Sequence, residues 1–501
     1  MKFIVLGLDG VGLGLIKGLK EEMPNLNRLL NDSAYGKLRT VYPPLTAATW
    51  TSFQTGKDIG RHKVINFFRL TKDFKMHLTS GLDVKEKTFY EIFDENNKKV
   101  FLLNLPYTRP PKIKGDIVYS WLCTGDNKDI NLFHPKSLPE KYPVLDGYTP
   151  FTEHSKGYLK TIKDHLKLTK KICSVIEEIA KHDYDLSCFI ISSTDWVQHK
   201  IYDKLLNNKN GRLARESKKI FAEVDRTIGN LLGKMDKDTY MIILSDHGFR
   251  EFKGKFFVNT FLKNGGYLST TGEGSKIKED IYRTKKKRDV NLSWLMNVIK
   301  SNKLLYKLLE PFYTFFVYLF PFNIIKSKID IKNSKAYCSF GCCPIIKIND
   351  NLDDKERNKI KQDIIKELKA TGKVEGHDIT TFYKGLAMEG DIIIDMKDYE
   401  IDNTFSSKEF LDIPRFHHSK DGFFLVKGMG IDNKLVKGAR IIDIQPTMLY
   451  LAGLPIPADV DGKVLDIFRK GFARKKAEYS ESNKSLKEKE RIKSVIRSLS
   501  V

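Results

Sequence analysis

Short runs of consecutive apolar residues recur along the chain, and longer stretches with helical periodicity separate them. The apolar runs are Phe3–Leu8, Val100–Leu105, Leu186–Ser192 and Tyr240–Leu244. Such runs are typical of strands that are buried on both faces of a parallel sheet. The residues Tyr158–Lys181 and Glu216–Lys234 have the period of amphipathic helices. This alternation predicts an α/β fold in which a mostly parallel central sheet carries helices on both faces.

The pattern changes between residues 266 and 333. A polar stretch leads to the basic run Lys285–Arg288 and then to an apolar segment, residues 311–325, that contains two prolines. This segment is too short and too interrupted for a convincing membrane span, so we expect an inserted lid or core helix. A membrane-surface segment flanked by lysines is the alternative.

The end of the chain predicts a basic amphipathic helix. Ser485 and Glu488 have the spacing of a capping box, and apolar residues between 486 and 499 lie broadly on one helical face. Whether this helix docks on the body of the protein, on a partner or on an anionic lipid surface stays open.

The formal net charge of +23 is concentrated in two stretches. Residues 283–335 hold twelve Lys and Arg against three Asp and Glu, and residues 469–501 hold eleven against four. The remainder is only mildly basic, which favours a core with basic appendages over a specific nucleic-acid surface. An anionic membrane surface is the partner that these two stretches would suit. A hydrophobic content of 41% excludes disorder over most of the chain.

Six cysteines are too few and too scattered for a disulfide framework. Cys338, Cys342 and Cys343 suggest a metal site only weakly, because no second Cys/His pair stands at zinc-finger spacing. The apolar run at the N-terminus is too short for a signal peptide. We therefore expect a cytoplasmic protein, with membrane association left open.

Possible ligands of a hard metal ion lie in four islands of the sequence, and the first three of these islands follow predicted strands. They are Asp9, Asp195 with His199, Asp246 with His247, and His418. The carboxyl ends of parallel strands meet at one edge of a sheet, and residues four apart share a helical face. Carboxylates and imidazoles without thiolates suit Zn²⁺, with Mn²⁺ or Fe²⁺ as alternatives. Each island alone is compatible with a helix cap or a solvated pair, so the prediction rests on their combination.

The segment Tyr42–Gly56 adds a candidate nucleophile. Its prolines stop the preceding segment, Ala47–Thr55 can form a short helix, and Gly56 can end it. Thr46 then lies at the helix N-terminus, which favours an anion. A metal-coordinated hydroxyl there can attack phosphorus. The alternative is that Thr46 is only an N-cap.

Together these motifs resemble those of the type I phosphodiesterases and nucleotide pyrophosphatases in the alkaline phosphatase superfamily. They are Asp9 in Gly-Leu-Asp-Gly, Thr46 ten residues before Gly56, Asp-x-x-x-His at 195–199, Ser-Asp-His-Gly at 245–248, and His418 four residues before Gly422. The residues Ile442–Pro455 and Asp461–Leu465 resemble closing elements of archaeal and bacterial members.

The resemblance implies an alkaline phosphatase-like core made of residues 1–265 and 334–468, an insertion at 266–333 and a basic tail at 469–501. It implies two divalent metal ions. One would be held by Asp195, His199 and His418, and the other by Asp9, Asp246 and His247. Thr46 would be a ligand of both ions and the nucleophile that forms a phospho-threonine intermediate. Thr49 stands where the family is expected to carry an asparagine that binds the transferred phosphoryl group, and its hydroxyl can donate one hydrogen bond.

The predicted activity is the hydrolysis of a phosphodiester or pyrophosphate bond in a phosphoester substrate. A hydrolase or transferase acting on phosphorylated lipids or lipid-linked sugars is an alternative. A non-catalytic, basic membrane- or RNA-associated protein with a hydrolase-like core is another, although none of the six ligands is missing. An oxidoreductase is disfavoured, because Gly12 and Gly14 are not followed by the acidic residue that a dinucleotide site needs.

Overall fold

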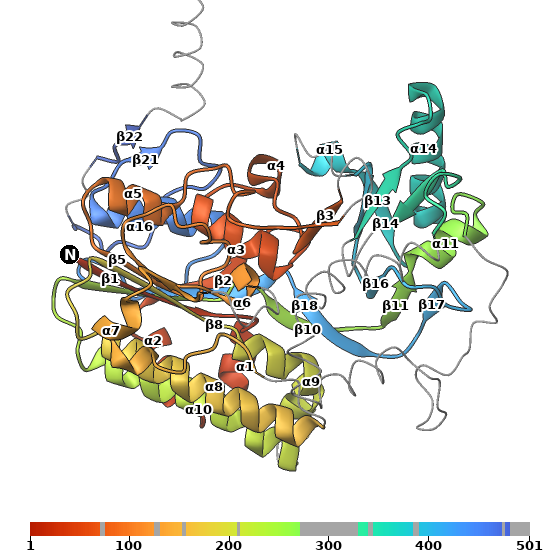
Figure 1. Ribbon diagram of the computed structural model, residues 1–501. Helices are drawn as coiled ribbons and strands as arrows, with labels where there is room; N and C mark the ends of the chain where they lie inside the picture. Colours follow the sequence, from red (N-terminus) through yellow and green to blue (C-terminus); the bar gives the residue numbers. More distant parts are fainter. Residues whose placement is uncertain are drawn as a thin grey trace, which may run out of the picture. The chain divides into compact units, whose positions relative to one another are not determined.

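The computed structural model describes residues 1–70, 76–124, 131–152, 157–207, 211–270, 329–338, 344–383, 390–472 and 476–480. The chain divides into two compact units (Figure 1). The first comprises Met1–Phe67, Thr79–Glu251 and Phe416–Val501. The second comprises Phe68–Leu78 and Phe252–Arg415.

The first unit is built on a sheet in which nine strands are described, in the order β20-β2-β19-β9-β1-β8-β5-β6-β7. The bounds are β1 Lys2–Leu8, β2 Ala34–Arg39, β5 Val100–Leu103, β6 Asp116–Val118, β7 Phe133–His134, β8 Leu186–Ile191, β9 Thr239–Leu244, β19 Asp421–Lys427 and β20 Ala439–Arg440. Neighbouring strands are parallel except at β19, which is antiparallel to β2 and β9, and at β7, which is antiparallel to β6. The mostly parallel sheet predicted from the apolar runs is confirmed.

The central strands are buried throughout their length. Every residue of β8 and β9 is buried, as is every residue of β5. Burial on both faces requires helices on both sides of the sheet, which explains why these strands are apolar throughout and do not alternate.

Helices cover both faces of this sheet (Figure 1). On one face lie α1 Leu13–Gly18, α2 Pro24–Leu30, α8 Tyr158–Ile179, α9 Ser193–Asn207 and α10 Arg212–Leu232. On the other face lie α3 Thr46–Thr55, α5 Phe89–Glu95 and α16 Ile444–Ala452. The long helices α8 and α10 are amphipathic: Ile172, Ile176 and Val224 are buried in the core, while Lys163 and Lys167 on α8 are exposed. Short helices at Ile59–His62 (α4), Trp121–Thr124 (α6) and Leu138–Lys141 (α7) complete this unit with the 3₁₀ turns Pro143–Leu145 and Ile441–Asp443.

The second unit has a core of its own. Its four-stranded antiparallel sheet has the order β12-β13-β15-β14, with β12 Ala336–Cys338, β13 Ile345–Ile348, β14 Glu375–Asp378 and β15 Ile392–Asp395. Helix α14, Asp354–Ala370, buries Ile360, Ile364 and Leu368. A further sheet has the order β16-β11-β17, with β11 Gly254–Phe257, β16 Tyr399–Asp402 and β17 Phe410–Leu411. Smaller elements are β3 Phe68–Leu70, β4 Met76–Leu78, α11 Val258–Asn264 and α15 Ile379–Phe382.

Two further pairs of strands lie outside these sheets. The strands β10 Gly248–Phe252 and β18 Arg415–Ser419 pair where the chain leaves the first unit and returns to it. The strands β21 Ile456–Pro457 and β22 Tyr479–Ser480 pair in parallel near the end of the described chain.

The division into units differs from the expected domain boundaries. Phe68–Leu78, residues 252–265 and residues 334–415, which we expected in the core, belong to the second unit. The apolar runs from which strands were predicted all belong to the first unit, so they do not indicate a second core. Most of the expected insertion (271–328) and of the basic tail (481–501) lies outside the described residues.

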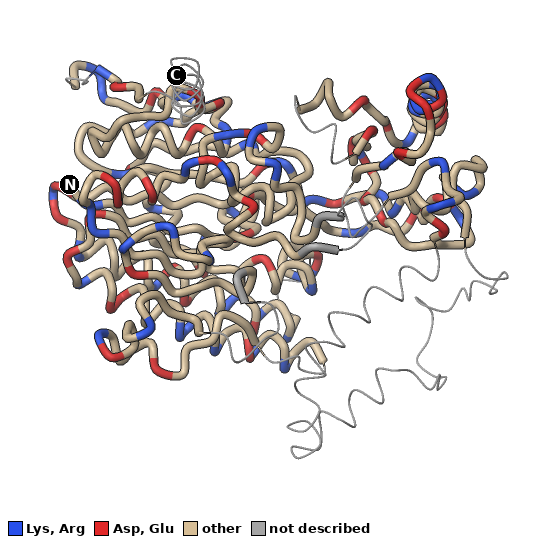
Figure 2. Tube along the Cα trace, turned by 45° about the horizontal axis from the view of Figure 1, so that its top comes forward, with Lys and Arg blue, Asp and Glu red and all other residues tan. Residues whose placement is uncertain are grey.

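The described surface carries both signs of charge. Figure 2 shows Lys and Arg interspersed with Asp and Glu along the described chain. The stretches that would suit an anionic membrane surface lie largely outside the described residues. Within the described part of the chain, no helix is long and apolar enough to cross a membrane.

Candidate metal centre

The predicted ligands gather at the carboxyl ends of three adjacent strands. Asp9 follows β1, and Asp195 lies in the first turn of α9, directly after β8. Asp246 and His247 follow β9. Because Leu8 pairs with Ile191 and Gly7 with Leu244, the three strands end at nearly the same level. The parallel register therefore brings together side chains that are far apart in the sequence.

Asp9, Asp246 and His247 form one group of possible ligands. His247 Nε2 is 3.5 Å from Asp9 Oδ1 and 3.5 Å from Asp246 Oδ2. One ligand atom from each of the three residues lies within 4.8 Å of the others, and all three side chains are buried. We call this group the Asp246 group.

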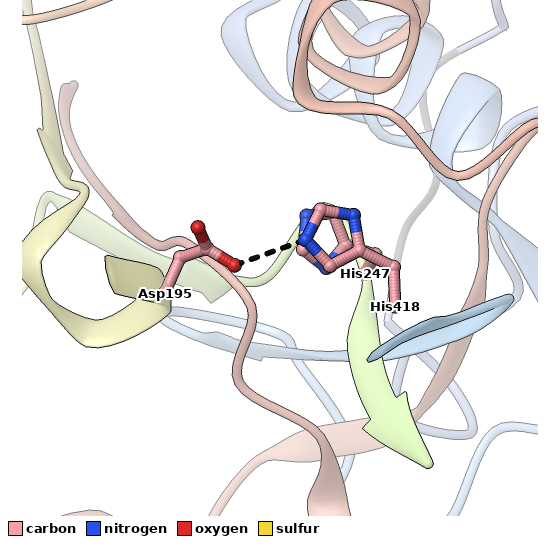
Figure 3. A group of neighbouring side chains, drawn as sticks. All are labelled: Asp195, His247 and His418. Atoms are coloured by element: carbon pink, nitrogen blue, oxygen red, sulfur yellow. Dashed lines mark ion pairs between the residues drawn. The ribbon is translucent and has the colours of Figure 1, made fainter. Parts of the chain in front are cut away.

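Asp195, His199 and His418 lie beside it and form what we call the Asp195 group. Asp195 Oδ2 is 3.4 Å from His199 Nε2, one helical turn further along α9. Asp195 Oδ1 is 3.3 Å from His418 Nε2, the contact drawn as a dashed line in Figure 3. The two histidine nitrogens Nε2 are 2.8 Å apart.

The two groups are contiguous. The rings of His247 and His418 stack with their centroids 3.7 Å apart, and Figure 3 shows Asp195 directed toward both rings. Asp195, His247 and His418 also qualify together as possible ligands of a single ion. Neither His417 nor His199 belongs to the groups of possible ligands whose atoms lie within 4.8 Å of one another among the described residues. His199 is included in the Asp195 group because of its contacts with Asp195 and His418.

Backbone carbonyls fix the orientation of two imidazole rings. His418 Nδ1 donates to the carbonyl of Pro44 at 2.8 Å, and His247 Nδ1 donates to the carbonyl of Gly248 at 3.3 Å. In a neutral ring the proton is then on Nδ1, so Nε2 keeps its lone pair. Both lone pairs face the carboxylates, which is the arrangement of metal-binding histidines whose other nitrogen is hydrogen-bonded.

The pKa values follow from burial and crowding. Burial, and after it the charges of Asp246 and Asp195, raise the pKa of Asp9 well above its ordinary value. Burial raises the pKa of Asp246 to about 7, although a hydrogen bond from Thr49 opposes this rise. Burial also acts on Asp195, but the nearby His199 and His418 hold its pKa well below the usual range. Burial and then repulsion from His418 lower the pKa of His247, so this ring is neutral.

These side chains fit divalent metal ions. Asp9 Oδ1, Asp195 Oδ1 and His247 Nε2 are buried and make no hydrogen bond to the described residues, although each lies within 3.5 Å of another atom of the site. Three carboxylic acids and the imidazole lone pairs thus converge, and ionising all three acids at once costs free energy unless a cation is bound, which agrees with the raised pKa values of Asp9 and Asp246. Oxygen and nitrogen donors without sulfur suit Zn²⁺, Mn²⁺ or Fe²⁺.

Three supporting side chains escaped the sequence analysis. Thr194 Oγ1 donates to the carbonyl of Asp9 at 2.7 Å, and Ser245 Oγ donates to the carbonyl of His247 at 2.6 Å. Gln198 Nε2 donates to the carbonyl of Gly10 at 3.1 Å. Thr194 and Ser245 each stand directly before a predicted ligand in the sequence, so their position beside a strand end was the available signal.

Gly10 is required by the same geometry. Its φ of +76° lies in the left-handed region, and a Cβ atom there would come within 2.9 Å of Asp195 Oδ1. Its N–H donates to Asp246 Oδ1 at 3.3 Å. A glycine after Asp9 therefore allows the backbone to turn and to approach both groups of ligands.

Thr46 is the first residue of α3, and the segment that carries it is attached to both groups. Pro44, two residues before it, accepts the hydrogen bond from His418 of the Asp195 group. Thr49, three residues after it, donates to Asp246 of the other group at 2.7 Å. The N-cap of α3 is Leu45, with no side-chain capping bond, so Thr46 does not have the simple capping role that was the alternative.

The remainder of α3 forms as its sequence predicts. Gly56 ends the helix with φ 63°, and its N–H donates to the carbonyl of Ser52. Thr49 is fully buried, and its hydroxyl contacts Asp246. A contact between Thr49 and substrate stays a prediction.

The fold and the site define a class of protein, an alkaline phosphatase-like hydrolase with a candidate site for divalent metal. A sequence model of the type I phosphodiesterase / nucleotide pyrophosphatase family matches residues 3–314. The chain belongs to this family, whose members hydrolyse phosphoester or pyrophosphate bonds. The oxidoreductase and non-catalytic alternatives find no support in this result. None of the curated proteins searched matches the chain.

Solved structures show the same fold. Phosphonoacetate hydrolase from Sinorhizobium meliloti 1021, in complex with phosphonoacetate, aligns with a TM-score of 0.53 and 14% identity, covering 89% of this chain and 94% of that chain. Human ectonucleotide pyrophosphatase / phosphodiesterase 5 aligns with a TM-score of 0.52 and 10% identity, covering 93% of this chain and 100% of that chain. At such identities the similarity establishes the fold alone.

Proposed function

We propose that this protein is a metal-dependent phosphodiesterase or pyrophosphatase in which Thr46 is the nucleophile. One observation carries the proposal: the segment around Thr46 is hydrogen-bonded to His418 on one side and to Asp246 on the other. A hydroxyl at this place would be shared by the Asp195 group and the Asp246 group. The family to which the chain belongs acts on the same class of bond.

The Asp195 group (Asp195, His199, His418) would hold one ion and the Asp246 group (Asp9, Asp246, His247) the other. When bound, two divalent ions supply the positive charge that favours an ionised hydroxyl and the charge developing on phosphoryl oxygens. Zn²⁺ fits the donors best, with Mn²⁺ and Fe²⁺ as alternatives. The chain's own contribution is to fix the carboxylates and the Nε2 lone pairs before substrate arrives.

The reaction has two steps. Oγ1 of Thr46 loses its proton to solvent and attacks phosphorus, and the bond to the leaving group breaks with its electron pair, giving a phospho-threonine. Water then attacks phosphorus, the bond to Oγ1 breaks, and Thr46 regains a proton. The first turn of α3 directs backbone N–H groups and the positive end of its dipole toward the phosphoryl oxygens.

The test compares Thr46→Ala with Thr55→Ala. Both hydroxyls belong to α3, but Thr55 Oγ1 donates only to the carbonyl of Thr51 within the helix. Steady-state hydrolysis of bis(p-nitrophenyl) phosphate and p-nitrophenyl phosphate is measured with Zn²⁺- or Mn²⁺-loaded protein. We expect Thr46→Ala to reduce diester turnover by a factor on the order of 10³ or more, and Thr55→Ala to retain it.

Acid-quenched protein adds a direct readout, because a phosphoryl group on the peptide containing Thr46 is detected by mass spectrometry. Diester turnover that is indifferent to Thr46→Ala would remove the nucleophile assignment. A stronger monoester signal would move the enzyme from the phosphodiesterases toward the phosphatases.

A further inference from the structure

The hydroxyl of Thr49 has one proton and three possible acceptors. The carbonyls of Leu45 and Thr46 lie at 3.0 Å and 3.2 Å, and Asp246 Oδ2 lies at 2.7 Å. A hydrogen bond to a carboxylate is shorter and stronger than one to a carbonyl. The proton therefore points to Asp246.

Two other threonines of α3 show what a threonine in this helix does without such an acceptor. Thr51 Oγ1 donates to the carbonyl of Ala47 at 2.7 Å, and Thr55 Oγ1 donates to the carbonyl of Thr51 at 2.8 Å. Both bonds stay inside the helix, which is the usual arrangement for a helical threonine. Thr49 differs from them because its shortest hydrogen bond leaves the helix.

The bond reaches the oxygen of Asp246 that faces the other ligands. Oδ1 of Asp246 accepts from the N–H of Gly10 at 3.3 Å, and Oδ2 accepts from Thr49. Oδ2 is also the atom that lies 3.5 Å from His247 Nε2. Two donors on opposite oxygens thus fix the plane of a fully buried carboxylate.

We propose that Thr49 is a positioning residue that sets the metal affinity of the Asp246 group by holding Oδ2 of Asp246. The hydroxyl is buried and already has its acceptor, so its proton is directed to a ligand and away from a phosphoryl oxygen. This inference rests on the metal-dependent function proposed above and deepens it. A side chain that orients a ligand contributes a factor of about 10 to 100 to metal affinity.

The experiment is a metal titration, which does not depend on turnover. Calorimetry with Mn²⁺, or Zn²⁺ in competition with a chromophoric chelator, is carried out on the wild type, Thr49→Val, Thr49→Ser and Thr51→Val. We expect Thr49→Val to weaken one of two binding steps by about 10- to 100-fold. Thr49→Ser restores the hydroxyl and should remain close to the wild type. Thr51→Val is the matched control, since it removes a hydroxyl that bonds only within α3.

A double-mutant cycle tests whether Thr49 acts through Asp246. Thr49→Val should add little to the loss that Asp246→Ala causes, because the residue it orients is already gone. Circular dichroism and thermal melting check that each variant folds. If Thr49→Val does not fold, the metal affinity of Thr49→Ser still provides a test.

Three results would overturn the proposal. They are wild-type affinity at both sites in Thr49→Val, an equal loss in Thr51→Val, and additive losses in the double variant. Protein that binds no metal at all would overturn it together with the candidate centre. Metal binding that responds to Thr49→Val in a protein without hydrolytic activity would leave this inference standing and remove only the proposed function.

Discussion

Two clusters of carboxylates in the first unit, one buried and one partly buried, differ in the source of their positive charge. In the Lys57 cluster (Lys57, Glu86 and Asp459), the lysine side chain is 3% exposed. Its Nζ lies 2.5 Å from Glu86 Oε2 and 2.8 Å from Asp459 Oδ2. Here the chain provides its own cation for the two acids.

The candidate metal centre has three carboxylates and no such cation. Among the described residues, the ion-pair partners of Asp9, Asp195 and Asp246 are histidines. Buried charges are normally paired or coordinate a metal. The same fold thus neutralises one cluster of carboxylates with a lysine and leaves the other to be neutralised by metal ions.

Removing the ions should have the largest effect. We expect exhaustive chelation to abolish diester hydrolysis and to lower the melting temperature, and Zn²⁺ or Mn²⁺ to restore both. Each site loses about 4 kcal/mol of stabilisation when free metal had exceeded its Kd a thousandfold. Differential scanning calorimetry with and without chelator measures this loss, and an unchanged melting temperature in metal-free protein would contradict it.

Removing the lysine should have the next largest effect, and on stability alone. Lys57→Met leaves Glu86 and Asp459 without their buried partner, which costs about 3 to 5 kcal/mol in the free energy of unfolding. Urea unfolding measures the cost, and metal titration should show both sites unchanged. A loss of metal binding in Lys57→Met would show that the two clusters are not independent.

An exposed pair provides the control for that variant. Lys253 Nζ lies 2.7 Å from Asp398 Oδ2, but the two side chains are 70% and 49% exposed. Water screens such a pair, so Lys253→Met should leave the urea midpoint nearly unchanged. A loss as large as that of Lys57→Met would mean that burial is not the reason for the difference.

A smaller effect than that of Lys57→Met concerns a neutral histidine outside the candidate metal centre. His62 is buried, its Nδ1 accepts from the N–H of Val64, and its Nε2 donates to Ser52 Oγ at 2.8 Å. Burial lowers the pKa of His62 from 6.5 to about 3. Because the unfolded chain binds the proton more readily, the stability that neutral His62 contributes is complete above pH 6.5 and declines toward pH 3.

The free energy of unfolding falls by about 2 kcal/mol between pH 6.5 and pH 5 because of His62. Urea unfolding of metal-free protein at several pH values measures it, with His62→Gln as the comparison that lacks the titrating group. An equal dependence on pH in His62→Gln would assign the slope to other groups. Using metal-free protein separates His62 from the histidines of the candidate centre.

Much of the fold can be predicted from the sequence, because each strand or helix is determined by the pattern of apolar residues within its own segment. The run Tyr240–Leu244 predicted a buried strand, and β9 covers Thr239–Leu244. The convergence of Asp9, Asp195 and Asp246 followed from a general property of parallel strands, without knowledge of their order. Strand ends therefore account for four of the six candidate ligands, Asp9, Asp195, Asp246 and His247, and helical spacing adds His199.

The remainder depends on contacts that are distant in the sequence. His418 belongs to β18, which pairs with β10 outside the central sheet, so only the family resemblance placed it with the others. The acceptor of Thr49 lies 197 residues away, and no local pattern identifies it. The extent of the second unit likewise depends on contacts between residues that are distant in the sequence.

The position of β19 has a consequence for synthesis of the chain. This strand lies between β2 and β9, yet it begins at Asp421, long after β9 has ended at Leu244. At about 5 to 20 residues per second, a ribosome needs roughly 9 to 35 s to make the intervening residues. During that time β2 and β9 each have an unpaired edge, which is a template for association with other chains. The nascent protein is therefore most prone to aggregate in an interval that ends only when β19, in the last sixth of the chain, emerges.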